Sequence, residues 1–492
     1  MSMIRVEHLN FSYPGSFDPV FQDVSFQIDT DWKLGFVGRN GRGKTTFLRL
    51  LQGAFPYGGT ISAPVGFDYF PYPVPDKALD AGRVLRQACP TGRDWELVRE
   101  LSLLRVGEEV LTRPFRTLSN GEQTKVLLAA LFLGDGRFPL IDEPTNHLDR
   151  EGRETVSAYL RRKKGFLLVS HDRAFLDGCV DHILSINRTD IEVRSGNFSG
   201  WMEDFQQRQA SERERNEQLA KDIGRLKQAS RRSADWSERV EASKKGKAAS
   251  GLKKDKGHVG HQAAKLMKRA KAIEARQEQA AEEKSKLLKN AERQEDLRLT
   301  ALSHHADRLA VFSDVVIQYG DRPVCGPISF SLCRGDRIAL TGRNGTGKSS
   351  LLRLLLGEPV PHRGTVETAS GLVISYVPQD TGHLSGTLSA YAAEKGIDES
   401  LFKTILRKMD FERVQFEKDM ADYSAGQKKK VLIAASLCER AHLYLWDEPL
   451  NYIDVYSRMQ IEALLTRFQP TMLFVEHDAA FQENIATAIV RL

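Results

Sequence analysis

The chain has 492 residues, of which 41% are hydrophobic and 28% are charged, so it is neither a wholly disordered nor a collagen-like protein. Its longest apolar run, Val126–Leu133, is far shorter than the ~20 residues of a membrane-spanning helix, which excludes a membrane-embedded protein. The formal net charge is +6, from 71 Lys and Arg against 65 Asp and Glu. Residues 201–300 hold 25 Lys and Arg against 17 Asp and Glu, so the basic excess belongs to this central segment.

The beginning of the chain and its cysteines indicate a protein that is not secreted. The first ten residues contain neither an apolar signal-peptide core nor a small-residue cleavage site. The cysteines form no Cys-x-x-Cys pair, so nothing indicates a zinc ribbon or a redox motif. We expect a cytoplasmic protein with reduced, mostly buried thiols at Cys89, Cys179, Cys325, Cys333 and Cys438.

The chain repeats itself, because four motifs recur in the same order 304–306 residues further on. They are GRNGRGKT at Gly38–Thr45 with GRNGTGKS at Gly342–Ser349, LSNGEQ at Leu118–Gln123 with YSAGQK at Tyr423–Lys428, LIDEPTNHLD at Leu140–Asp149 with LWDEPLNYID at Leu445–Asp454, and VSHD at Val169–Asp172 with VEHD at Val475–Asp478. This near-constant spacing predicts two homologous domains, at residues 1–204 and 307–492, on either side of the basic segment.

Each repeat has the pattern of an α/β domain. In the first, the apolar run 33–37 leads into a glycine-rich turn and a helix-like stretch at 46–51, and the run 138–141 is a further buried strand followed by Asp-Glu. The second repeats this order at 337–340, 350–356 and 443–446. Strands that alternate with helical stretches predict a mostly parallel sheet with helices on both faces.

Residues 205–306 have a different pattern. They contain no proline and are rich in Ala, Glu, Lys, Arg and Gln, and apolar residues recur there at intervals of 3, 4 and 7. At 243–260, four glycines interrupt the pattern. The segment is predicted to form a long α-helical hairpin linker with a basic tip near 243–260.

The first repeated motif is a P-loop, Gly-x-x-x-x-Gly-Lys-Ser/Thr. Its glycines let backbone N–H groups point at phosphates, its lysine brings positive charge to the β- and γ-phosphates, and its hydroxyl ligates Mg²⁺. A single match has an ordinary glycine-rich turn as its alternative, but two matches at the repeat spacing favour ATP binding. The predicted ATP ligands are Gly38, Asn40, Gly41, Gly43, Lys44, Thr45 and Thr46, and Gly342, Asn344, Gly345, Gly347, Lys348, Ser349 and Ser350, with Thr45 and Ser349 also as Mg²⁺ ligands.

Two acidic residues follow a buried strand in each repeat. Asp142 and Asp447 are placed to hold Mg²⁺. Glu143 and Glu448 are placed to orient and deprotonate an attacking water. The alternative is that these carboxylates only cap helices. The histidines predicted to contact the γ-phosphate are His171 and His477.

The order of P-loop, LSNGEQ or YSAGQK, Asp-Glu and His resembles that of the ATP-binding cassette (ABC) ATPases, over about 390 residues in two copies. The resemblance implies a head-to-tail arrangement, in which each ATP lies between the P-loop of one cassette and the signature motif of the other. It implies further ATP contacts from Ser119, Gly121, Glu122, Ser424, Gly426 and Gln427, and from two aromatic residues that stack on adenine, Tyr13 and Tyr319.

The two repeats depart from each other at one position of the family pattern. Gln379 in SYVPQD matches the glutamine that helps to ligate Mg²⁺ and to orient the attacking water. The first repeat has Tyr72 in DYFPYP at that position. We therefore predict that Gln379 contributes to ATP and Mg²⁺ binding in the second repeat and that the two ATP sites are unequal.

Three kinds of ABC ATPase fit tandem cassettes. A transporter ATPase needs a membrane partner, and a DNA-repair ATPase of the excision type has zinc cysteines that this chain lacks. Two cassettes joined by a long charged helical linker resemble the ABC-F family, and the EPLNYID form and extended tip resemble its antibiotic-resistance branch of the lincosamide, streptogramin A and pleuromutilin type. A housekeeping ABC-F translation factor is the closest alternative.

The charge pattern of the linker favours structured RNA as its partner. Residues 221–270 hold 15 Lys and Arg against 5 Asp and Glu, and rigid helices with such charge suit phosphate contacts. The alternative is a solvated hairpin without a nucleic-acid partner. The predicted RNA contacts are Arg231, Arg232, Lys244, Lys245, Lys247, Leu252, Lys253, Lys254, Lys256, Lys265, Lys268 and Arg269.

The ABC-F resemblance implies a cycle on the bacterial ribosome, without a membrane domain or DNA, and a monomer whose two cassettes pair within the chain. ATP binding closes the cassettes at the exit site beside the P-site tRNA, the tip reaches the peptidyl transferase centre of 23S rRNA, the drug leaves, and hydrolysis releases the protein. Because the tip contains no aromatic residue, we expect Leu252, Lys253 and Lys254 to act through shifted tRNA and rRNA rather than as an aromatic plug.

Overall fold

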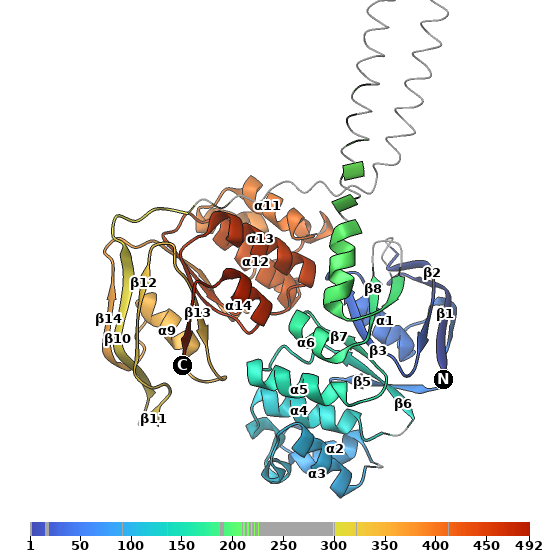
Figure 1. Cartoon of the computed structure of the whole chain (residues 1–492). Coiled ribbons are helices and arrows are strands. Elements are labelled where there is room, and N and C mark those ends of the chain that lie inside the picture. Colours follow the sequence, from blue (N-terminus) through green and yellow to red (C-terminus); the bar gives the residue numbers. More distant parts are fainter. Residues whose placement is uncertain are drawn as a thin grey trace, which may run out of the picture. The chain divides into compact units, whose positions relative to one another are not determined.

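The computed structural model describes residues 2–14, 19–90, 92–134, 136–186, 191–208, 299, 301–320, 322–411 and 413–492, together with seven positions between 210 and 225. The chain divides into two compact units, one made of Met1–Trp201 with Asp296–Leu492 and the other of Met202–Glu295. The first unit contains both repeats (Figure 1), called the first half and the second half below. The predicted tip at 243–260 and all the RNA contacts predicted between residues 231 and 269 lie outside the described residues.

The first half contains two sheets. Among the described residues, the smaller sheet is antiparallel and contains three strands, β1 (Met3–Phe11), β2 (Phe21–Asp29) and β4 (Gly58–Ser62). The larger sheet contains six strands in the order β5 (Gly66–Phe70), β6 (Arg137–Asp142), β7 (Phe166–Val169), β3 (Lys33–Gly38), β8 (His182–Ile186) and β9 (Ile191–Ser195). The larger sheet is parallel from β5 to β8, and β9 pairs antiparallel with β8.

The helices of the first half cover this sheet and form a helical region beside it. They are α1 (Lys44–Leu51), α2 (Ala81–Ala88), α3 (Asp94–Leu103), α4 (Asn120–Leu131), α5 (Arg150–Arg161) and α6 (Arg173–Cys179), with 3₁₀ turns η1 (Glu108–Thr112) and η2 (Phe115–Thr117). Figure 1 shows α2 and α3 beside α4, which begins at the signature motif. Residues 198–208 form a further helix.

The second half repeats this architecture. Its smaller sheet contains β11 (Arg322–Pro323), β10 (Arg308–Tyr319), β12 (Ile328–Cys333) and β14 (His362–Thr368). Its larger sheet is parallel throughout and contains β15 (Ile374–Val377), β16 (Leu443–Asp447), β17 (Met472–Val475), β13 (Arg337–Thr341) and β18 (Ala488–Arg491), in that order. Its helices are α9 (Lys348–Leu355), α10 (Leu388–Lys395), α11 (Glu399–Lys408), α12 (Ala425–Cys438), α13 (Val455–Phe468) and α14 (Ala479–Ile485), with η4 (Arg413–Glu417) and η5 (Met420–Asp422). The predicted α/β class with two P-loop domains is confirmed.

The central strands have the sequences that buried parallel strands require. FLLV in β7, LYLWD in β16 and MLFV in β17 are buried along their whole length, as expected for strands with helices on both faces. The core of the second half includes Trp446 and Phe474, and that of the first includes Phe36 and Phe47. These strands end at the residues that form the site.

Aspartates at helix starts hold the loops that follow the central strands. Asp149 and Asp454 accept hydrogen bonds from backbone N–H groups at the starts of α5 and α13. Asp172 and Asp478 do the same for α6 and α14, immediately after the two motif histidines. The last residues of each repeated motif therefore fix a loop geometry as well as carrying charge.

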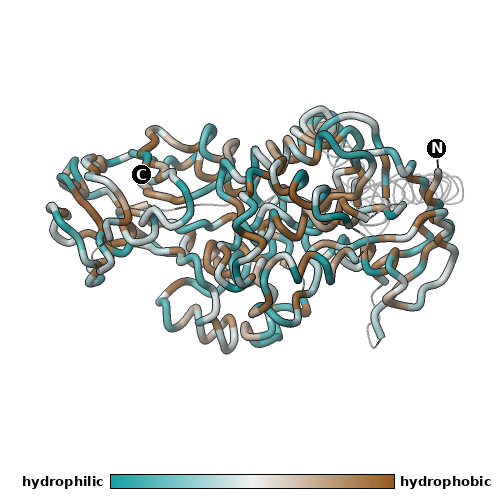
Figure 2. The backbone as a smooth tube through the Cα atoms, turned by 90° about the horizontal axis from the view of Figure 1, so that it is seen from below, coloured by the Kyte–Doolittle hydropathy of each residue, from teal (hydrophilic) through white to brown (hydrophobic). Residues whose placement is uncertain are grey.

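No helix in the described part of the chain is long and apolar enough to cross a membrane. In Figure 2 the coloured tube alternates between hydrophobic and hydrophilic stretches over short distances.

Candidate ATP sites

Both P-loops have a backbone that only glycine adopts without strain. Gly41 and Gly43 have φ of +84° and +91°, and Gly345 and Gly347 have φ of +83° and +84°. Gly43 also has no room for a side chain, since a Cβ there would lie 2.5 Å from Val20 Cγ1. Each loop runs directly into α1 or α9, so its N–H groups and the helix N-terminus can face one anion.

The P-loop lysines fold back onto their own loops. Lys44 Nζ donates to the carbonyl oxygens of Gly38 at 2.8 Å and Arg39 at 3.1 Å. Lys348 Nζ donates in the same way to Gly342 at 2.9 Å and Arg343 at 2.8 Å. Burial lowers the pKa of both ammonium groups. A phosphate in the loop would supply a stronger partner for this desolvated charge than neutral carbonyls do.

The residues predicted to hold Mg²⁺ lie together in each half. Thr45 Oγ1 donates to Asp142 Oδ2 at 2.9 Å. In the second half, burial raises the pKa of Asp447 to about 6, while a hydrogen bond from Ser349 opposes the rise. Asp447 Oδ1 is buried and has no hydrogen-bond partner among the described residues. A buried carboxylate oxygen without a partner, next to a hydroxyl, fits a divalent cation.

Glu143 and Glu448 have a strained backbone. Their φ angles are +49° and +45°, in the left-handed region that glutamate rarely adopts. The backbone N–H of each donates, at 2.9 Å, to the carbonyl oxygen of the residue that ends the neighbouring strand, Val169 or Val475. This turn directs the two glutamates to the ends of the strands, beside the motif histidines.

The glutamate of the second half is surrounded by donors. Gln379 Nε2 and Asn451 Nδ2 donate to Glu448 Oε2 at 2.8 and 2.7 Å, and His477 Nε2 lies 3.5 Å from Oε1. Burial opposes ionisation, but His477, Gln379 and the charge of Lys348 hold the pKa of Glu448 at about 2. Glu448 is therefore a carboxylate at neutral pH.

The glutamate of the first half has different surroundings. Burial and the charge of Asp142 raise the pKa of Glu143 to about 8. His171 Nε2 lies 3.2 Å from Glu143 Oε1, but burial and the charge of Lys44 lower the pKa of His171 far below its usual value. Tyr72, at the position of Gln379, makes no hydrogen bond to Glu143 in the described structure. The Q-loop difference thus coincides with a difference in the state of the glutamate.

The tyrosines predicted to stack on adenine are held at equivalent positions. Tyr13 follows β1, and its hydroxyl lies 2.7 Å from Thr46 Oγ1. Tyr319 ends β10, and its hydroxyl lies 3.0 Å from Ser350 Oγ. The two residues are 41% and 49% exposed, so part of each side chain remains accessible to a base.

Each signature motif begins a helix. Ser119 caps α4 and Ser424 caps α12, and Glu122 and Gln427 complete a capping box in each case. These capping hydrogen bonds account for the serine and for the Glu or Gln three residues later without any ligand.

The P-loop of each half contacts the loop after the Asp-Glu motif of the other. Asn40 Nδ2 donates to the carbonyl oxygen of Tyr452 at 2.8 Å, and Asn344 Nδ2 donates to that of His147 at 3.4 Å. A Cβ on Gly426 would lie 3.3 Å from Asn40 Nδ2, so the second signature motif approaches the first P-loop. The order of these contacts is head to tail.

Three polar residues at the sites were absent from the sequence prediction. Asn451 contacts Glu448, and Tyr69 donates to Asp142 Oδ2 at 2.9 Å. Lys429 Nζ donates at 2.8 Å to the carbonyl oxygen of Pro378, directly before Gln379, and burial lowers its pKa to about 8. Asn451 and Tyr69 had a signal, because Asn451 repeats Asn146 within the DEP motif and Tyr69 repeats Tyr376. Lys429 had none, since Thr124 stands at its position in the first repeat.

Comparison with known proteins identifies the class. The ABC transporter family matches residues 21–146 and 325–451, which together make just over half of the chain. The chain belongs to this family: it carries two ABC ATP-binding domains in tandem and is an ATPase. ATP-binding domains of this family bind ATP with Mg²⁺.

Three relatives that align with 93–96% of the chain, VmlR, Uup and YheS, are ABC-F family proteins. The ribosome protection protein VmlR of Bacillus subtilis is 27% identical over 486 residues, which cover 96% of this chain and 84% of VmlR. The ATP-binding protein Uup of Caulobacter vibrioides is 27% identical, with 96% and 75% covered. Among solved structures, RNase-L Inhibitor matches with a TM-score of 0.62 at 21% identity, covering 99% of this chain and 87% of the other, which concerns the fold alone.

Proposed function

We propose that this chain is a cytoplasmic ABC-F ATPase that acts on the bacterial ribosome and protects it from antibiotics bound at the peptidyl transferase centre. The observation that carries the proposal is a pair of head-to-tail ATP sites in one chain, which aligns over 96% of its length with 84% of a ribosome protection protein. Asn40 contacts Tyr452 and Asn344 contacts His147, so each P-loop touches the other half directly. ATP bound at a P-loop would therefore favour closure of the two halves.

In each site the residues of this chain divide the work of hydrolysis. The P-loop amides with Lys44 or Lys348 bind the phosphates, and the tyrosines Tyr13 and Tyr319 stack on adenine. Mg²⁺, held by Thr45 with Asp142 and by Ser349 with Asp447 and Gln379, would neutralise phosphate charge. Glu448, ionised and oriented by Gln379 and Asn451, accepts a proton from the attacking water. The histidines His171 and His477 orient the γ-phosphate.

The basic segment at 205–306 would carry the effect to RNA. Its 15 Lys and Arg against 5 Asp and Glu within residues 221–270 suit contacts with the phosphates of 23S rRNA and P-site tRNA at the exit site. Leu252, Lys253 and Lys254 at the tip would act nearest the drug. The classes of drug proposed are lincosamides, streptogramin A and pleuromutilins.

Co-sedimentation with ribosomes tests the partner. The Glu143→Gln/Glu448→Gln double variant with ATP should pellet with bacterial ribosomes, because closed cassettes cannot return to the open state, and the same variant without ATP should stay in the supernatant. The Lys44→Ala/Lys348→Ala variant is the matched control, because it lacks the lysines that bind the ATP phosphates. It should stay in the supernatant with or without ATP. An ATP-loaded double variant that never pellets would favour the transporter alternative.

Inhibitory concentrations in a drug-sensitive host separate protection from a housekeeping role. Expression of the wild-type chain should raise the inhibitory concentration of the three drug classes, and alanine at Leu252, Lys253 and Lys254 should abolish the rise while ATPase activity persists. Ribosome binding without any rise in resistance would favour the housekeeping translation factor.

A further inference from the structure

Each half contains a buried arginine that ties two of its own loops. Arg153 Nη1 donates to Asp172 Oδ2 at 2.7 Å, and its Nε donates to the carbonyl oxygen of Leu148. Arg458 Nη1 donates to Asp478 Oδ2 at 2.8 Å, and its Nε donates to the carbonyl oxygen of Ile453 at 2.9 Å. These equivalent contacts join the helix after the Asp-Glu motif to the loop that carries the motif histidine.

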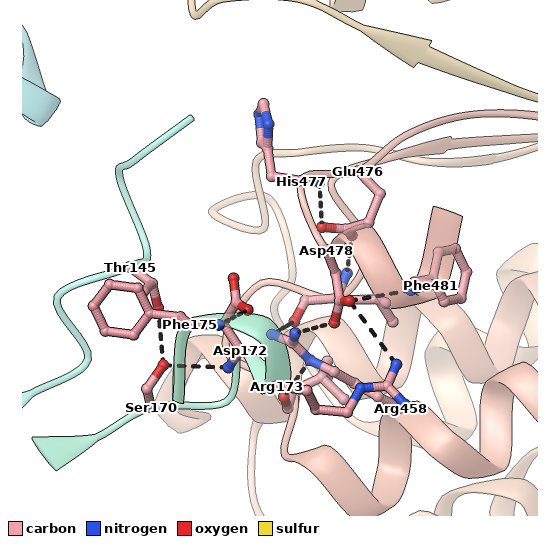
Figure 3. Close-up of polar contacts among 12 residues, drawn as sticks. Thr145, Ser170, Asp172, Arg173, Phe175, Arg458, Glu476, His477, Asp478 and Phe481 are labelled. Carbon is pink, nitrogen blue, oxygen red and sulfur yellow. Dashed lines mark hydrogen bonds and ion pairs between the residues drawn. The ribbon is translucent and has the colours of Figure 1, made fainter. Parts of the chain in front are cut away.

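A second arginine crosses from one half to the other. Arg173, two residues after His171, makes a two-pronged ion pair with Glu462 on α13, with Nη1 3.3 Å from Oε2, and its Nη2 lies 3.9 Å from Asp478 Oδ1. The Arg173, Glu462 and Asp478 side chains are 15%, 9% and 0% exposed. Figure 3 shows Arg173 between the loop of Asp172 and the pair formed by Asp478 and Arg458.

This crossing has no counterpart at the equivalent positions. Alignment of the repeats pairs Arg173 with Ala479 and Glu462 with Ser157, so neither charge recurs. It also pairs Asn484, which donates to Glu462 Oε2 at 3.2 Å, with Gly178. Arg173, Glu462 and Asn484 thus fill one contact between the halves. Their equivalents Ala479, Ser157 and Gly178, among other residues, instead line a cavity of about 380 Å³.

The crossing contact lies between the histidine loops of both ATP sites. Arg173 follows His171 in the loop of the first site, and its second ion-pair partner, Asp478, directly follows His477 of the second site. We propose that Arg173 is a positioning residue that couples the two ATP sites, so that closure of one histidine loop favours closure of the other. Because Ala479 carries no charge, this ion pair does not recur at the equivalent position of the second half.

The physical basis of the coupling is the burial of its charges. Burial opposes the ionisation of Asp478, and Arg458 and Arg173 together hold its pKa below the ordinary value. Withdrawal of Arg173 would leave Glu462 with the neutral Asn484 as its remaining partner among the described residues and Asp478 with Arg458 as its ion-pair partner. The loss at Glu462 is costly because a desolvated carboxylate depends on its cation. The Arg173–Glu462 pair is therefore satisfied only when the histidine loop of the first half lies against α13 of the second.

The test is the dependence of the steady-state ATPase rate of the full-length chain on ATP concentration. The wild type should show a Hill coefficient above 1. Arg173→Met, which keeps length but removes charge, and Glu462→Gln, which keeps shape, should each bring the coefficient to about 1 and weaken binding of the second ATP by about fivefold or more. Arg173→Lys should keep part of the coupling, while melting temperatures show whether the fold persists.

Arg86→Met is the matched control, because Arg86 forms an exposed pair with Asp94 within the first half. Its Hill coefficient should equal that of the wild type. If Arg173→Met does not fold, Glu462→Gln alone carries the test. A wild-type coefficient of 1, or one that neither variant changes, overturns the proposal, as would an equal loss in Arg86→Met.

Discussion

The two ATP sites of this chain share their phosphate-binding loops and differ around the glutamate. Both lysines bind P-loop carbonyls in the same way, and both glutamates adopt the same left-handed backbone. Yet the pKa of Glu448 is about 2 and that of Glu143 is about 8. The difference shows that equal motifs do not make equal sites, since the charge of a buried carboxylate depends on donors supplied by other segments.

The largest expected effect comes from replacing the glutamate of the second half. Glu448→Gln should lower ATPase activity at pH 7 by ~10²-fold or more, because it removes an ionised general base. Glu143→Gln should lower it far less, because Glu143 is protonated at that pH. Steady-state phosphate release measures both. Equal losses in the two variants would contradict the inequality of the sites.

A pH profile sharpens the same comparison. Glu143 has a raised pKa of about 8, so it becomes the required carboxylate only as the pH rises through that value. The residual activity of the Glu448→Gln chain should therefore increase about tenfold per pH unit between 6 and 8 and then level off. The Glu143→Gln chain, which relies on Glu448, should vary little over this range, and a flat profile for both would be the contrary result.

Exchanging the Q-loop residues tests the cause of the difference. Gln379→Tyr removes a donor to Glu448 Oε2 and should reduce the rate of the second site by roughly tenfold or more, because a hydrogen bond to a charged group contributes about 1.5–3 kcal/mol. Tyr72→Gln should raise the rate of the first site and move its pH profile downward. Each exchange is measured with the opposite glutamate replaced by Gln. Unchanged rates would assign the difference to Asn451 instead.

The smallest expected effect concerns Tyr69. Tyr69→Phe removes the hydrogen bond to Asp142 and should raise the Mg²⁺ concentration for half-maximal rate by about two- to tenfold. Tyr376→Phe is the matched control, because the equivalent hydroxyl makes no hydrogen bond to Asp447 in the described structure. Tyr69→Phe is titrated with Mg²⁺ in the Glu448→Gln chain, and Tyr376→Phe in the Glu143→Gln chain, so that each titration reports on one site. Equal shifts in the two variants would contradict a specific role for Tyr69.

Much of the fold was predictable because local patterns agree with the final structure. The strands at 33–37 and 443–446 are apolar, unbroken runs, and each P-loop joins its strand to a helix in the predicted order. The sequence also predicts unequal sites, since Tyr72 stands where the second half has Gln379. The raised pKa of Glu143, which burial and the charge of Asp142 cause, was not visible in the sequence.

The remaining features depend on residues far apart in the chain. Tyr69 lies 73 positions before Asp142, and Arg173 lies 289 positions before Glu462, and neither pair belongs to a motif. No local rule relates such partners, because the contact exists only after the sheets have formed and the two halves have met.

The sequence by itself determined that this chain has two ABC ATPase halves, since glycines with left-handed φ, a lysine and buried strands that end in acids each follow from residue type and spacing. Only the tertiary structure decided how the copies differ. Burial raises the free energy of each charged group, and folding determines which partners surround it. Glu448 is therefore ionised while Glu143 is protonated at neutral pH. Arg173 likewise joins the two halves at one place, while a cavity lies at the equivalent residues.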